Sequence, residues 1–122
     1  MCRKLNRLEL SWMDALFQVG FKGKEILQNQ IKTAKIVREE GYSIISIKFT
    51  IDDDKERFPN KVRVPVEMRA YQEKTAPIVF LIHVLDGVLD ELEIFTADSS
   101  KIEQELINLQ NVEYVVNKEL VM

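Results

Sequence analysis

The 122-residue chain is 46% hydrophobic and carries 17 basic against 20 acidic residues, a formal net charge of −3. This length and apolar content suffice for a core without disulfides or metal, so we expect one α+β domain over residues 1–122. The single cysteine, Cys2, excludes an internal disulfide and suits a reducing cytosol. No apolar run approaches the ~20 residues of a membrane span. We therefore expect a cytoplasmic protein that does not contact a membrane.

The charge is unevenly distributed along the chain. Residues 1–40 hold 8 basic against 5 acidic residues, whereas residues 41–122 hold 9 against 15. An acidic surface repels phosphate backbones, which argues against direct nucleic-acid binding. Such a surface can instead steer a protein partner with a basic surface, although the competing interpretation is a solvated face that maintains solubility.

The N-terminal third has the periodicity of helices. Apolar residues recur at three-to-four spacing between Leu5 and Phe17, which predicts an amphipathic helix lying on a core. Two glycines interrupt the pattern, and a second helix is expected from about Lys24 to Thr33. Residues 35–38 predict a short strand that ends at residues 39–41.

Two alternating segments follow. Residues 45–51 alternate apolar and polar side chains and predict a strand that begins at about Tyr42. Residues 62–70 alternate as well, and Pro65 favours an edge strand or a bulge there. The intervening loop, residues 52–60, begins with three aspartates but lacks the ligand spacing of a calcium loop, so we interpret it as a solvated hairpin tip.

The Asp86-Gly87 dipeptide lies between two apolar runs and predicts a two-residue β-hairpin turn. Counting outward from this turn pairs residues 78–85 with residues 88–95 and places His83 opposite Asp90. Regular alternation then assigns eight side chains to one face: Val79, Leu81, His83, Leu85, Val88, Asp90, Leu92 and Ile94.

The C-terminal segment permits two interpretations. Ser100 followed by Glu103 resembles a capping box and predicts a helix, beyond which residues 112–116 form a last strand or extend that helix. Together these patterns predict an α+β fold. Two N-terminal helices pack on a four- to five-stranded antiparallel meander, with a C-terminal helix.

Catalytic chemistry finds little support in the residue types. His83 is the single histidine, and one cysteine with one histidine cannot form a typical zinc site. The glycines match no phosphate-binding fingerprint. We therefore predict no enzymatic activity, no cofactor and no metal. The pair of His83 and Asp90 is either a buried imidazole held by a carboxylate or the centre of a pocket in a small-molecule-binding or minor enzymatic domain.

Three runs carry a family resemblance: FKGKEILQNQIKTAKIV (21–37), VRVPVEMRA (62–70) and LIHVLDGVLDELEIFTAD (81–98). This combination of an aromatic-Gly-x-x-x-Leu-x-x-Gln helix, an Arg-Val-Pro-Val-Glu strand and an acidic hairpin resembles a family of small, uncharacterised bacterial α+β domains. The resemblance implies an immunity-type role and supplies no catalytic residues.

The expected function is therefore a non-catalytic protein-binding domain of the immunity or adaptor type. We assign the binding surface to Glu91 and Glu93, with Asp86 and Asp98 nearby. If the helices cover only one face of the sheet, apolar residues on the other face remain exposed. Homodimerisation through that face is then expected.

Overall fold

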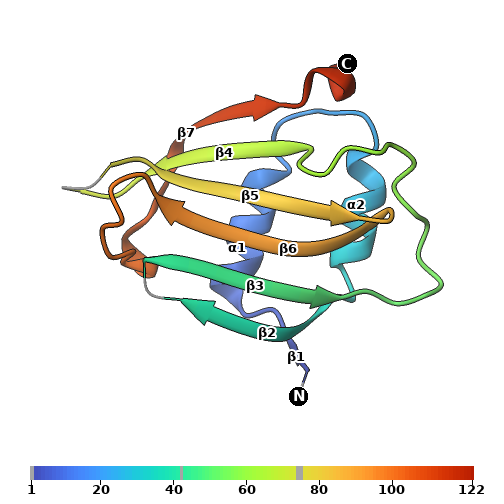
Figure 1. Cartoon of the computed structure of the whole chain (residues 1–122), viewed down its shortest axis with the longest axis horizontal. Helices are drawn as coiled ribbons and strands as arrows, with labels where there is room; N and C mark the ends of the chain where they lie inside the picture. Colours follow the sequence, from blue (N-terminus) through green and yellow to red (C-terminus); the bar gives the residue numbers. More distant parts are fainter. Residues whose placement is uncertain (1, 42, 74–75) are drawn as a thin grey trace.

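The computed structural model describes residues 2–41, 43–73 and 76–122. These residues form a seven-stranded antiparallel sheet in the order β1-β2-β3-β6-β5-β4-β7, with two helices packed on one of its faces (Figure 1). Two short 3-10 turns follow β6. The elements in chain order are β1 (Arg3–Lys4), α1 (Arg7–Leu16), α2 (Lys24–Ile31), β2 (Lys35–Gly41), β3 (Ile44–Thr50), β4 (Val66–Tyr71), β5 (Ile78–Leu85), β6 (Val88–Thr96), η1 (Gln104–Leu106), β7 (Asn108–Val116) and η2 (Lys118–Leu120).

The predicted α+β class with an antiparallel sheet is confirmed, but the meander and the strand count are wrong. Strands β4, β5 and β6 follow one another, whereas β3 pairs with β6 and not with its successor β4. Residues 51–65 therefore run past the end of the sheet from β3 to β4 (Figure 1). Sequential neighbours are the commonest arrangement, but a connection this long allows the β2–β3 hairpin to dock on β6.

Both predicted N-terminal helices are confirmed and form the second layer behind the sheet. The inward face of α1 buries Trp12, Met13 and Leu16, and the Trp12 and Phe80 rings meet edge to face at 5.9 Å. Helix α2 buries Leu27 against the same layer. Among the described residues, no helix lies on the opposite face of the sheet, so the core lies between one sheet face and two helices (Figure 1).

Buried Gln30 fastens α2 to the hairpin tip and to the long loop. Its amide nitrogen donates to the Glu56 and Gly87 carbonyl oxygens, each at 2.9 Å, and its amide oxygen accepts the Leu89 N–H at 2.9 Å. The Phe58 amide donates to the same Gly87 oxygen at 2.8 Å. Buried polar groups in proteins are paired in this way, and here the pairing fixes three segments relative to one another.

The hairpin turn is confirmed, but the register beyond it is wrong. Both turn residues have positive φ, and Leu85 and Val84 pair with Val88 and Leu89 as predicted. A β-bulge then leaves Asp90 without a partner residue and pairs His83 with Glu91. The bulge turns Leu92 and Ile94 into the core, where each is at most 1% exposed. Inserting one residue lets the inward faces before and after it both be apolar.

The predicted C-terminal helix is wrong, and the alternative of a last strand is confirmed. The groups that would cap a helix are engaged elsewhere: Ser100 donates to Asp98 from its backbone nitrogen and its hydroxyl, and the Glu103 amide donates to Gln72 at 2.6 Å. Strand β7 instead pairs with β4, which makes β4 an interior strand that starts after Pro65. The predicted start of β3 at Tyr42 lies outside the described residues.

Candidate interaction surface

The helix-free side of the sheet carries a dense set of charged side chains, which we call the open face. Cross-strand register places these residues in rows that run from β2 to β7. The open face consists of Arg38, Glu40, Ile44, Ser46, Lys48, Glu67, Arg69, Tyr71, Val79, Leu81, His83, Leu85, Asp90, Glu91, Glu93, Phe95, Glu113 and Val115.

The four acidic residues assigned from sequence do not form one patch. Glu91 and Glu93 lie side by side on β6 within the open face. Asp86 belongs to the turn before β6, and Asp98 follows its far end. Nine residues of β6 at about 3.3 Å each separate these two by roughly 30 Å. The surface around Glu91 and Glu93 therefore continues across the neighbouring strands. It does not continue along β6 to Asp86 and Asp98.

Glu91 is held by β3 on one side. The Ser46 hydroxyl donates to Glu91 Oε2 at 2.6 Å, and Lys48 Nζ lies 3.2 Å from Glu91 Oε1. Burial raises the pKa of Glu91, but the bonds from Ser46 and Lys48 outweigh it, so the pKa lies below the ordinary value. The carboxylate is consequently charged at neutral pH and fixed in orientation.

Lys48 also binds Asp90, the extra residue of the bulge. Its Nζ donates to Asp90 Oδ2 at 3.0 Å, and Arg63 lies 3.8 Å from the same oxygen. The bonds to Asp90 and then to Glu91 raise the pKa of Lys48. The sequence-based pairing of Asp90 with His83 is therefore wrong, because the bulge presents Asp90 to the lysine on β3.

His83 instead contacts Glu93. Its Nε2 lies 2.9 Å from Glu93 Oε1, and the imidazole side chain is 15% exposed. The other ring nitrogen, Nδ1, is buried and has no hydrogen-bond partner among the described residues. The hydroxyl of Ser46, on the open face, donates to Glu91 and not to the imidazole. The arrangement orients a histidine but does not assemble a nucleophile with a base.

The remaining carboxylates of the open face are paired in the same way. Arg69 Nε donates to Glu67 Oε2 at 2.7 Å, and the Tyr71 hydroxyl donates to Glu113. The hydrogen bond to Glu113 is the main reason that the pKa of Tyr71 lies above its ordinary value. The open face is thus a fixed pattern of alternating charges with an acidic excess. Its apolar residues are partly exposed at Val79, Leu81 and Phe95 and exposed at Ile44 and Val115.

The sequence analysis did not include the residues of β3 and β4 in the binding surface. Ser46 and Lys48 are the outward positions of one alternating strand, and Glu67 and Arg69 are those of another. The alternation predicts that these side chains leave the core. Their proximity to Glu91 and Glu93 follows from strand order, for which the sequence gives no local signal.

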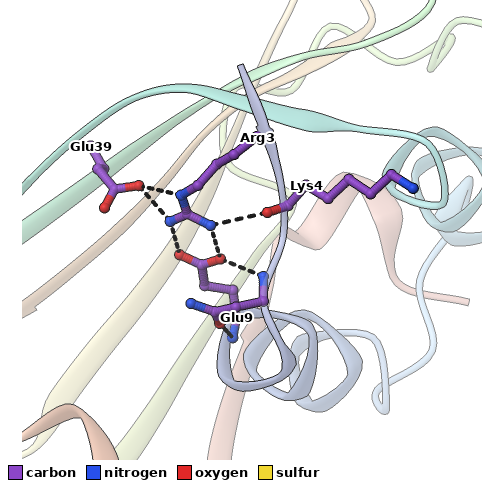
Figure 2. A network of polar contacts seen from close by, with 5 residues as sticks. Arg3, Lys4, Glu9 and Glu39 are labelled. Carbon is purple, nitrogen blue, oxygen red and sulfur yellow. Dashed lines mark hydrogen bonds and ion pairs between the residues drawn. The ribbon is translucent and has the colours of Figure 1, made fainter. Parts of the chain in front are cut away.

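A second polar cluster ties the N-terminal segment to the fold (Figure 2). Arg3 forms a bidentate pair with Glu9, at 2.8 and 2.6 Å, and also donates to Glu39. Burial raises the pKa of Glu9, but hydrogen bonds from Arg3 and from the Asn6 amide lower it further, so it ends below the ordinary value. Because Glu9 also closes the capping box of α1 with Asn6, we interpret this cluster as a structural fastening.

The comparisons with known proteins give a family. A protein-family model with the description "Domain of unknown function (DUF6984)" matches residues 2–106. The chain belongs to this family. No curated protein and no solved structure matched it. The family match ends just before β7, although the tail completes the core: the Tyr114 hydroxyl donates to the Ala15 carbonyl at 2.6 Å, and Leu120 is fully buried.

Two further findings concern the described residues. They contain no helix that is long and apolar enough to cross a membrane. They also contain no group of three or more His, Cys, Asp or Glu side chains placed to hold a metal ion.

Proposed function

We propose that this protein is a non-catalytic protein-binding domain of the immunity or adaptor type, and that it binds a basic partner through the open face. The observation that supports the proposal most strongly is that one face of a seven-stranded sheet has no covering layer within the described residues. That face carries an acidic excess in a fixed arrangement.

The pairing of the open-face charges favours recognition over catalysis. Glu91 and Glu93 are each oriented by a hydrogen bond, to Ser46 and His83. Carboxylates that are already oriented lose less side-chain entropy when a partner binds. Side chains that alternate in sign also select for a partner with the complementary pattern, since like charges at an interface cost several kcal/mol.

A bacterial immunity role is supported by the sequence resemblance of the helix, strand and hairpin motifs to small bacterial domains. It is also supported by the chemistry, because an inhibitor that blocks a basic surface needs charge and shape and no catalytic group. Homodimerisation is the competing proposal for the same face. The open face has exposed apolar residues at its margins, Ile44 and Val115, but its acidic excess would repel the identical face of a second copy. We therefore favour a partner of opposite charge over a homodimer.

The test compares two double variants with the same change in charge. Glu67→Gln with Glu93→Gln removes two negative charges from the open face and preserves side-chain volume. Glu25→Gln with Glu119→Gln removes two charges from exposed positions elsewhere. Each protein is tagged and used for affinity capture from a lysate of the native source, followed by mass spectrometry.

We expect a basic protein that wild type and the control capture equally and that the open-face variant recovers at most about one-fifth as well, as removal of interface charges predicts. Equal recovery by all three proteins would refute the open face as the binding surface. Light scattering at tens of micromolar distinguishes homodimerisation from binding of a different protein. A wild-type dimer that dissociates in the open-face variant would assign this face to a second copy.

A further inference from the structure

A hollow of about 410 Å³ lies at the β1 edge of the sheet, where the link from β1 to α1 meets the turn from α2 to β2. Its volume falls within the range of small-molecule pockets, roughly 300–1,000 Å³. It is lined by Lys4, Leu5, Leu10, Ile31, Lys32, Thr33, Ala34, Lys35 and Asp52. Aliphatic side chains and three lysines therefore share one concave site.

Two of these lysines form an unfavourable cross-strand pair of like charges. Lys4 and Lys35 are direct cross-strand partners in the β1–β2 ladder, so their side chains leave the sheet on the same side. Like charges placed directly opposite one another destabilise an antiparallel pair. The effect matters here because β1 has only two residues, so the lysine pair is one of its two cross-strand pairs with β2.

The ammonium groups of these lysines form no ion pair within the part of the chain that the structure describes. No ion pair to Lys4, Lys32 or Lys35 occurs within residues 2–41, 43–73 and 76–122, and Asp52 is the one acidic residue among the described lining residues. Figure 2 shows the Lys4 side chain directed away from Glu9 and Glu39, which are both occupied by Arg3. The lining of the hollow thus has three lysines against one aspartate, an excess of positive charge.

The C-terminus of α2 stabilises only one of the three lysines. Lys32 is the C-cap residue of α2, and a cation near a helix C-terminus is stabilised by the macrodipole. That explanation does not extend to Lys4, which comes from a different segment and faces Lys35. An anion bound between the two ammonium groups would remove the repulsion and add attraction to both of them.

The floor of the hollow specifies the rest of the ligand. Leu5, Leu10 and Ile31 present aliphatic surface, and Leu10 is 41% exposed in the free protein. Apolar walls with a few polar groups at one side are typical of sites for amphipathic small molecules. We propose that this hollow binds a small amphipathic anion, with a carboxylate or phosphate head between Lys4 and Lys35 and an apolar body on Leu5, Leu10 and Ile31.

The test is a titration followed by amide chemical-shift mapping on the full chain. Octanoate and octyl phosphate are the probes, which also separates the two head groups. Octanol tests the apolar body without charge, and inorganic phosphate tests the charge without the body. Lys4→Gln with Lys35→Gln removes the cross-strand pair, and Lys22→Gln with Lys118→Gln is the control with the same loss of charge at exposed positions.

We expect at least one probe to bind saturably and to shift amides around residues 4–10 and 31–35. Both half-ligands should bind more weakly. The Lys4/Lys35 variant should bind at least about fivefold more weakly than the control, and in low salt without ligand it should melt no lower than wild type, since it relieves a repulsion.

Three results would overturn the proposal. The first is no saturable binding of either probe below about 5 mM, the range of weak small-ligand affinities. The second is equal binding by the two variants. The third is a set of shifts centred on another surface, or octanol shifts that match those of octanoate.

Discussion

Gln30 offers the sharpest test of how the fold positions its segments. The side chain is fully buried and makes three hydrogen bonds of 2.9 Å, to the long loop, to the hairpin turn and to the first residues of β6. Gln30→Ala would leave the buried Leu89 N–H without an acceptor. The Gly87 oxygen keeps its bond from Phe58, and the Glu56 oxygen belongs to an exposed residue that water can reach.

The expected loss follows from this inventory. One buried unpaired N–H costs about 1–3 kcal/mol, and the truncated side chain adds a cavity term, so we expect Gln30→Ala to lower the free energy of unfolding by about 2–4 kcal/mol. Gln30→Met retains most of the volume and loses the hydrogen bonds, and should lose about 1–3 kcal/mol. Exposed Asn29→Ala, on the same helix, is the control.

Urea unfolding measures these differences. With an m-value of about 1–3 kcal/mol/M, a loss of 3 kcal/mol lowers the midpoint by roughly 1–3 M at unchanged m. A Gln30→Ala midpoint that corresponds to less than about 0.5 kcal/mol would refute the reasoning, since ordinary surface substitutions fall within that range. A large loss in Gln30→Ala with none in Gln30→Met would assign the effect to packing alone.

Three further predictions use the same assays or NMR. The pKa of Glu9 lies below its ordinary 4.5, so its charged form stabilises the fold above that pH, and this stabilisation is lost as the pH falls through the lowered pKa. Glu9→Gln should therefore lower the urea midpoint near pH 7 much more than near pH 3. An equal loss at both pH values would contradict this. Glu93→Gln should move the imidazole nitrogen signals of His83, whereas Asp90→Asn should leave them unchanged; the reverse result would restore the regular hairpin register. Gly87→Ala places a Cβ 3.0 Å from the Phe58 carbonyl oxygen at a φ of +78°, so we expect a loss of about 1–3 kcal/mol, and a midpoint equal to wild type would argue against the turn geometry.

Elements with local signals were predicted well from the sequence. The periodicity of α1, the alternation of β3 and the Asp86-Gly87 turn each depend on side chains within a few residues of one another. The bulge also left a trace that regular counting overlooked. Leu89 and Leu92 are both buried although they are three positions apart, a spacing that strict alternation forbids.

The missing parts depend on contacts between distant segments. In the candidate capping box, the Glu103 amide donates to Gln72, which lies 31 residues away in the sequence. Likewise, Lys48 joins Asp90 and Glu91 only because β3 docks on β6. Strand order decides these contacts, and local sequence patterns do not specify it.

The association rate with the captured partner tests the central claim most directly. For binding through the open face, the rate should fall with rising salt in wild type and in the Glu25→Gln/Glu119→Gln control. In the Glu67→Gln/Glu93→Gln variant it should be several-fold lower at low salt and less sensitive to salt, because the steering charges are gone. Identical rates and salt dependence in all three proteins would contradict the assignment of the open face as the partner-binding surface.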